Sequence, residues 1–312
     1  MTRRLENQFA ATACNERPWR GFDYVSESVA GAAPLHAFVH AGDAGKPVIF
    51  VVHGLFDSNS NRYVRTIASA LADDGFGVIV PDMRWHGCLI GMPSSLGIDE
   101  SADLAAWSRA MTAKPPFAHR KAGMLGVSLG ALDAIDAAAR DDAAAAFPAG
   151  VIALDPPAAI AHIRDALDQP LLARHRDSST LLTGAFRFFL AVRNRRSGIP
   201  FWSRRPFFRY LDRAAREHAP PFPPDADALT AAAEPVHDRL AAVRRPLLII
   251  SAKNDPILTP LATEALTTAA AGLTYVHVVA TDGGGHVGII ARDPQWFADA
   301  MKNFFSNAER VP

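Results

Sequence analysis

The sequence predicts an α/β protein with a mainly parallel β-sheet that is covered by helices on both faces. From Pro47 onward, short apolar runs rich in β-branched residues alternate with Ala-rich or amphipathic stretches. Most of these runs are apolar throughout, which is typical of strands buried on both faces of a parallel sheet. A long segment, 156–239, interrupts the alternation and contains no clear strand.

The strands are read from the apolar runs between turn residues. The expected strands are Phe22–Ser28, Leu35–Ala41, Pro47–Val52, Gly77–Pro81, Ala122–Val127, Gly150–Leu154, Pro246–Ser251 and Thr274–Ala280. The first two have the weaker pattern, and we expect them to be antiparallel strands at the edge of the sheet.

The helices are read from apolar positions at helical spacing and from runs of alanine. In the first, apolar residues recur at Val64, Ile67, Ala68 and Leu71. The expected helices are Asn61–Asp74, Glu100–Met111, Leu129–Ala146, Pro260–Ala271 and Pro294–Ser306. Strands alternating with helices in this way predict a sheet covered by helices on both faces.

Composition excludes several classes of protein. The chain has 312 residues, with 32 Lys plus Arg against 32 Asp plus Glu. The resulting zero net charge argues against a general binder of nucleic acid. Its 2 cysteines, Cys14 and Cys88, exclude a disulfide-rich scaffold and a Cys-rich zinc site. We expect a soluble, cytoplasmic protein because no signal peptide or long apolar run is visible.

The motif Gly126-Val127-Ser128-Leu129-Gly130 has the pattern G-x-S-x-G. It stands between an expected strand and an expected helix, where a sharp turn would raise the Ser128 hydroxyl above the sheet. The alternative is an ordinary turn in which Ser128 caps the helix. The context favours Ser128 as a nucleophile.

A serine nucleophile needs a base, and the base needs an acid that orients it. His286 ends Gly283–His286, a glycine-rich turn after the last expected strand. Asp255 follows the preceding strand, so that serine, acid and histidine come in the order that this arrangement requires. Asp155, which follows Leu154, is the competing acid.

The segment His53–Phe56 (HGLF) follows the strand Pro47–Val52. Its glycine permits a turn that directs the Leu55 N–H at a developing oxyanion, and the Leu129 N–H is the expected second donor. A zinc site at His53 is disfavoured, because no further ligand follows at metal spacing.

These motifs, together with PDMRWHG at Pro81–Gly87 and AKNDP at Ala252–Pro256, resemble the α/β-hydrolase superfamily. Within it, the stretch that begins at His53 looks like the YheT-like esterases. The resemblance implies a Ser128–Asp255–His286 triad, a core made of 1–155 and 240–312, and a mostly helical cap inserted as 156–239. Trp85 and Ala131 depart from the family pattern, which puts the substrate range in doubt rather than the chemistry.

Within the expected cap, Arg174–Arg216 contains eleven arginines, two aspartates and eight aromatic residues. The simplest interpretation is solvated arginines around a small helical core. The alternatives are an acyl pocket whose arginines attract an anionic substrate, and a patch that contacts a membrane surface.

The resulting hypothesis is a serine hydrolase that cleaves carboxylic esters of small molecules, without cofactor, metal or nucleic acid. Two alternatives stay open: an acyltransferase with the same triad, and a ligand-binding protein without catalysis. Asp82 and Arg84 are expected to buttress the loop at the sheet top, and Asp57, Asn59 and Asn61 to be turn or helix-cap residues. The oligomeric state does not follow from the sequence.

Overall fold

The structure is a computed structural model that describes residues 14–55, 57–92, 94–140, 144–157, 208–209, 212, 227–228, 239–255 and 259–307. Most of the expected cap, 156–239, and most of Arg174–Arg216 lie outside these residues. The boundaries of the core and the cap therefore stay predictions.

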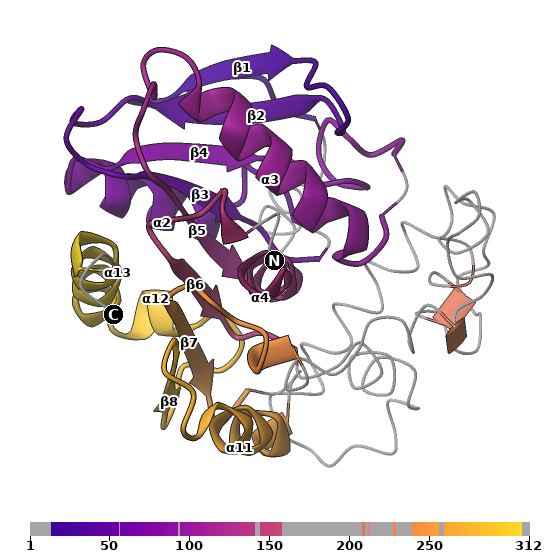
Figure 1. Ribbon diagram of the computed structural model, residues 1–312, viewed down its shortest axis with the longest axis vertical. Helices are drawn as coiled ribbons and strands as arrows, with labels where there is room; N and C mark the ends of the chain where they lie inside the picture. Colours follow the sequence, from indigo (N-terminus) through magenta and orange to yellow (C-terminus); the bar gives the residue numbers. More distant parts are fainter. Residues whose placement is uncertain are drawn as a thin grey trace, which may run out of the picture.

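The centre of the molecule is one eight-stranded sheet with the strand order β1-β2-β4-β3-β5-β6-β7-β8 (Figure 1). The strands are β1 (Asp23–Glu27), β2 (Leu35–His40), β3 (Val48–Val52), β4 (Gly77–Pro81), β5 (Ala122–Val127), β6 (Val151–Leu154), β7 (Leu247–Ala252) and β8 (Val276–Thr281). The pairs from β4 to β8 are parallel, whereas β1 and β2 are antiparallel to their neighbours. The predicted fold class is confirmed.

Helices cover both faces of the sheet (Figure 1). One buried core joins the sheet to α3 (Ile98–Thr112), α4 (Leu129–Ala139) and α11 (Thr259–Ala270). A second core, on the other face, joins it to α2 (Arg62–Asp73), α12 (Ile289–Arg292) and α13 (Pro294–Asn307). β3 and β5 are buried along their whole length, which explains their continuous apolar sequence.

Each predicted strand agrees with an observed one to within two residues at either end. The helix predicted as one element over Leu129–Ala146 is interrupted at Arg140. α4 ends at Ala139, because Arg140 has the extended angles φ −88° and ψ 130°, and an α-helix cannot continue through them. α3 begins before the predicted Glu100, whose carboxylate accepts hydrogen bonds from the amides of Ser95 and Gly97 at the helix start.

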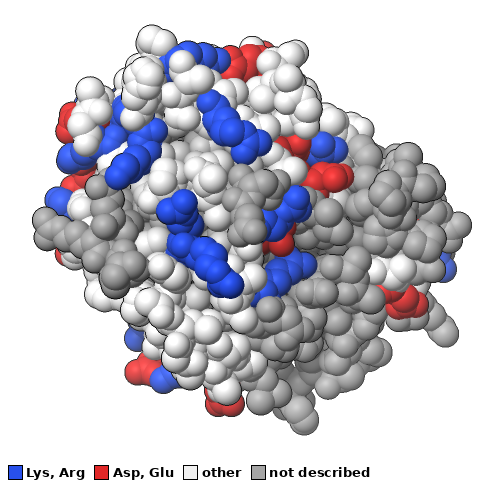
Figure 2. All heavy atoms as spheres, in the orientation of Figure 1, with Lys and Arg blue, Asp and Glu red and all other residues white. Residues whose placement is uncertain are grey.

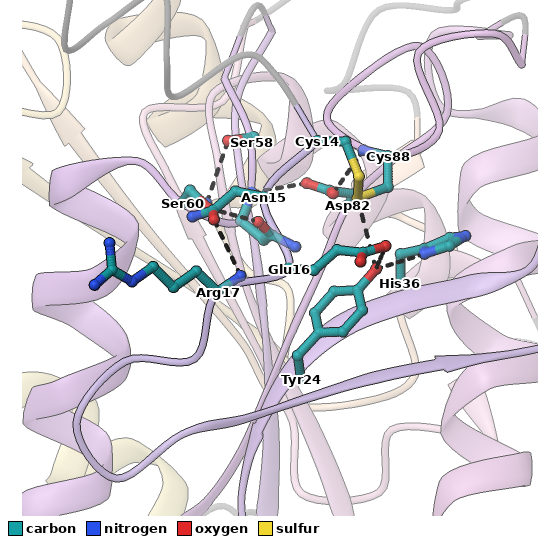
Figure 3. Close-up of a disulfide and its surroundings, with 11 residues drawn as sticks. Cys14, Asn15, Glu16, Arg17, Tyr24, His36, Ser58, Ser60, Asp82 and Cys88 are labelled. Atoms are coloured by element: carbon teal, nitrogen blue, oxygen red, sulfur yellow. Dashed lines mark hydrogen bonds between the residues drawn. A yellow bond between two sulfur atoms is a disulfide. The ribbon is translucent and has the colours of Figure 1, made fainter.

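Cys14 and Cys88 form a disulfide that the sequence did not predict (Figure 3). It joins the segment before β1 to the loop after β4 across a sequence separation of 74 residues. A cross-link of this kind restricts the unfolded chain and typically stabilises a protein by about 2–4 kcal/mol. The Cys88 N–H also donates to Asp82 Oδ2 at 2.9 Å, so the link fixes a loop beside the sheet top.

Asp133 on α4 is a buried carboxyl group whose Oδ1 has no hydrogen-bond partner among the residues described. Burial, followed by the charges of Glu100 and Asp136, raises the pKa of Asp133 well above its usual value. The folded state therefore retains a proton that the unfolded chain releases, and stability must fall as the pH rises above about 4.

We expect Asp133→Asn to stabilise the protein at pH 8, because the amide carries no charge that burial would penalise. Urea unfolding at pH 5 and pH 8 measures this, and the variant should lose less stability between the two than the wild type. The exposed Asp73 is the control, because Asp73→Asn removes a carboxylate that stays in water. Equal losses in Asp133→Asn and the wild type would contradict the expectation.

Candidate active site

Ser128 stands at the turn between β5 and α4, at the carboxyl end of the parallel strands. Its backbone angles, φ 55° and ψ −113°, are strained for a residue with a side chain, and its side chain makes no capping bond. A Cβ at position 126 would lie 1.9 Å from the Gly130 carbonyl oxygen, and one at position 130 would lie 2.6 Å from the His53 oxygen. The motif glycines are therefore required by close backbone packing, and the helix-cap alternative for Ser128 does not hold.

His286 lies between Ser128 and Asp255. Its Nε2 is 2.9 Å from Ser128 Oγ, and its Nδ1 is 2.7 Å from Asp255 Oδ2. Asp255 is 3% exposed, so its interaction with the imidazole takes place away from water. The three side chains that the sequence pointed to, which come from the ends of three different strands, thus form one hydrogen-bonded chain.

Asp155, the competing acid, has a different set of partners. Its Oδ1 accepts the Ala252 N–H at 2.9 Å and its Oδ2 accepts the Val287 N–H at 2.7 Å. It therefore ties the end of β7 to the backbone next to His286, whereas Asp255 bonds the imidazole itself. Burial raises the pKa of Asp155 to about 6, although the charge of His286 works against this rise.

The electrostatics around His286 favour its protonated form. Burial by itself would lower the pKa of His286, but the hydrogen bond and charge of Asp255 outweigh it, and Asp155 and Asp57 add to their effect. The net pKa is raised. An imidazole in this setting can accept a proton from Ser128 because the resulting cation is stabilised.

The loop after β3 lies directly against Ser128, since a Cβ at position 54 would be 3.1 Å from Ser128 Cβ. The Gly54 oxygen accepts the Asp57 N–H at 3.3 Å and lies 2.8 Å from His53 Nδ1. The His53 Nε2 accepts the Met83 N–H at 3.1 Å, so both ring nitrogens contact backbone groups rather than standing free for zinc.

The amides of Leu55 and Leu129 are the predicted oxyanion donors. In a trans peptide the Leu55 N–H points away from the Gly54 oxygen, which the two contacts above hold in place. Within the described ranges, neither amide donates to a protein acceptor. Their role as oxyanion donors stays a prediction.

Asp82 and Arg84 hold the neighbouring loops in place. Asp82 accepts the backbone N–H groups of Asn59 and Cys88, each at 2.9 Å, and burial raises its pKa to about 7 (Figure 3). Arg84 pairs with Asp103 on α3, with Nε 2.6 Å from Oδ2. Trp85 has a positive φ of 69° and packs into the core.

The sequence did not reveal the roles of two residues beside the site, Tyr63 and Asp57. Tyr63 had no predicted role, and Asp57 was expected to be only a turn or helix-cap residue. Tyr63 O–H donates to Asp57 Oδ2 at 2.7 Å, and the Tyr63 oxygen accepts the Gly54 N–H at 2.9 Å. The only sequence signal is the position of Tyr63 in the first turn of α2.

Two groups of side chains in the described part have spacing that could hold a metal ion. One consists of Asp155, Asp255 and His286, whose polar atoms are already engaged in the contacts above. The other contains the disulfide-bonded Cys14 and Cys88 with Glu16. A reaction without cofactor or metal stays a prediction.

A model of the Alpha/beta hydrolase family matches residues 48–300. The chain belongs to this family. The match runs from β3 through the first half of α13 and includes the positions of Ser128, Asp255 and His286. The closer placement among YheT-like esterases stays a prediction.

Several solved structures share the fold. The esterase Pf2001 of Pyrococcus furiosus is 17% identical with a TM-score of 0.66, covering 92% of this chain and 90% of its own. The enol-lactonase of Burkholderia xenovorans LB400 is 18% identical with a TM-score of 0.58, covering 90% of this chain and 100% of its own. Est1E of Butyrivibrio proteoclasticus, solved with ferulic acid, is 17% identical with a TM-score of 0.58, covering 91% of this chain and 98% of its own. No curated protein matches the sequence.

No helix among the described residues has the length and apolar character needed to cross a membrane. On the face shown in Figure 2, Lys and Arg occur at several separate places, and Asp or Glu lie beside some of them. This mixture fits the zero net charge of the whole chain.

Proposed function

We propose that this member of the family is a serine hydrolase that cleaves carboxylic esters through Ser128, His286 and Asp255. The observation that carries the proposal is the hydrogen-bonded chain from Ser128 Oγ through the imidazole to a buried carboxylate. A hydroxyl that shares its proton with an oriented imidazole is an activated nucleophile.

In the first half of the reaction, Ser128 Oγ attacks the ester carbonyl carbon while His286 Nε2 takes the hydroxyl proton. The carbonyl oxygen becomes negative and accepts hydrogen bonds from the Leu55 and Leu129 amides. The tetrahedral intermediate then collapses, the bond to the alcohol oxygen breaks, and His286 returns the proton to that oxygen. The products are a free alcohol and an acyl-enzyme on Ser128.

In the second half, His286 takes a proton from water, and the hydroxide oxygen attacks the acyl carbon. Collapse of this second intermediate breaks the bond to Ser128 Oγ, which recovers its proton from His286. General-base catalysis of this kind contributes on the order of 10²–10⁴ in rate, and each oxyanion donor on the order of 10²–10³. Asp255 stabilises the imidazolium in both halves.

The similar structures support esters or lactones of small molecules as the substrate class, since they include an esterase, an enol-lactonase and Est1E with bound ferulic acid. We also propose that 156–239 forms a cap over this site. Within it, the arginines of Arg174–Arg216 would bind anionic substrates or contact a membrane surface. The cytoplasmic location stays a prediction, and the disulfide counts against it because disulfides are rare in cytosolic proteins.

A panel of p-nitrophenyl esters with graded acyl length tests the proposal. We expect turnover that peaks at one chain length, with free acid as the product by mass spectrometry. Adding coenzyme A, glycerol or another acceptor separates hydrolysis from acyl transfer, because a transferase forms the new ester or thioester instead of free acid. Tight binding of esters without any turnover would contradict the proposal and favour a non-catalytic ligand-binding protein.

A further inference from the structure

A chain of hydrogen bonds from helix α2 ends on the loop that carries the proposed oxyanion donor. The Gly54 N–H donates to the Tyr63 oxygen at 2.9 Å, and the Tyr63 O–H donates to Asp57 Oδ2 at 2.7 Å. The other carboxylate oxygen, Oδ1, accepts a hydrogen bond from Asn61 Nδ2. None of these contacts involves Ser128, Asp255 or His286.

We propose that Tyr63 and Asp57 are positioning residues, which hold Gly54 so that the Leu55 N–H stays directed at the oxyanion. The inference rests on the proposed function. The Gly54 N–H and the Gly54 oxygen belong to the two peptide groups on either side of its Cα, and the second peptide group carries the Leu55 N–H. With its N–H bonded to Tyr63 and its oxygen to the Asp57 amide, Gly54 is fixed on both sides.

The direction of each hydrogen bond in this chain is fixed by which of its groups carry a proton. A phenol has a single proton, so a Tyr63 oxygen that accepts from Gly54 must donate its proton elsewhere, and Asp57 Oδ2 is the acceptor. Asp57 faces two donors, the Tyr63 O–H and the Asn61 amide, and an ionised carboxylate can accept from both. An asparagine at position 57 keeps a single side-chain acceptor oxygen.

The hydrogen bonds to Asp57 favour its ionised form, against the effect of burial. Burial raises the pKa of Asp57 to about 7, whereas the hydrogen bond from Tyr63, the charge of His286 and the hydrogen bond from Asn61 act in the opposite direction. Asp57 is the third carboxylate whose charge acts on His286, after Asp255 and Asp155. Because an Asp57 substitution also changes that charge, the tyrosine has to be tested by itself.

Tyr63→Phe removes the hydroxyl and leaves every charge in place. We expect kcat for the best ester to fall about 10- to 100-fold, since a small displacement of a catalytic donor costs up to about 10²-fold. KM should stay within about twofold, because the donor acts on the transition state more than on the bound ester. The affinity for an alkylboronic acid, which forms a tetrahedral adduct on Ser128, should fall in parallel with kcat.

Tyr24→Phe is the matched control. Tyr24 O–H also has a close partner, His36 Nδ1 at 2.7 Å, but it lies on β1 at the sheet edge. This variant should keep kcat and boronic acid affinity at the wild-type level. A Tyr63→Phe protein that keeps the wild-type kcat, or that loses kcat only in proportion to its unfolded fraction, overturns the proposal.

A double-variant cycle on residues 57 and 63 tests the hydrogen-bond chain itself. Asp57→Ala removes the acceptor of the Tyr63 proton and should lower kcat. Because the two side chains act through one chain, the double variant Asp57→Ala, Tyr63→Phe should lose much less than the product of the two single losses. Losses that multiply fully in the double variant, or no loss in Asp57→Ala, overturn the proposal. If Ser128→Ala keeps its activity, the proposed function fails instead, whatever these variants show.

Discussion

Replacing Ser128 by alanine is expected to lower ester turnover by about 10⁴-fold or more. The variant removes the attacking oxygen, and any residual rate then comes from water attacking an ester bound near the Leu55 and Leu129 amides. The fold should persist, because the Ser128 hydroxyl bonds only to His286 Nε2 in the described structure. Steady-state kinetics on the best ester of the panel measures the loss.

The exposed Ser28 provides the control for Ser128→Ala. Ser28→Ala should keep the full rate, and urea unfolding of both variants should resemble that of the wild type. If Ser128→Ala were as active as Ser28→Ala, the chemistry would have to be assigned to another group. A loss of activity accompanied by loss of the unfolding transition would show a damaged fold. In that case, covalent labelling of Ser128 in the wild type would decide whether this residue is the nucleophile.

Replacing Asp255 by asparagine should lower kcat by about 10³- to 10⁴-fold, whereas Asp155→Asn should cost far less, about tenfold. A side-chain amide in place of the Asp255 carboxylate can hold the imidazole in the wrong tautomer and cannot stabilise the cation that forms. Asp155 bonds two backbone amides, so its asparagine variant weakens the support of the His286 loop without touching the imidazole contact.

Comparing kcat of the two variants with their stability distinguishes these roles. Asp155→Asn should lose more stability relative to its loss of rate, since asparagine leaves one of the two amides without an acceptor. The reverse order, with Asp155→Asn nearly inactive and Asp255→Asn nearly normal, would transfer the role of the acid to Asp155. That outcome would leave Ser128 and His286 in place.

The strands, and the three residues that form the hydrogen-bonded chain, could be found because their signals in the sequence are local. Strands such as β3 and β5 are apolar throughout because both of their faces are buried. The elbow at Ser128 needs glycines at 126 and 130, where a Cβ would overlap the backbone of Gly130 or His53. The order of the motifs along the chain then limited the choice of histidine and acid to a few residues.

The remaining features depend on contacts between distant segments, which a single sequence does not reveal. Cys14 and Cys88 are 74 residues apart, and nothing in the spacing of two cysteines indicates that they meet. Tyr63 bonds Gly54 only because α2 packs beside the end of β3, so its hydroxyl had no visible partner in the sequence. The early end of α4 at Ala139 was hidden by an alanine run with high helix propensity.

The central claim, that Ser128 is the activated nucleophile, is tested most directly by a fluorophosphonate probe followed by peptide mass spectrometry. We predict one phosphonate adduct per chain, located on Ser128, formed in step with the loss of esterase activity and absent from Ser128→Ala. The adduct should form far more slowly in His286→Ala, which keeps the serine but removes its base. An adduct on a different residue, or full loss of activity with Ser128 unmodified, would contradict the account.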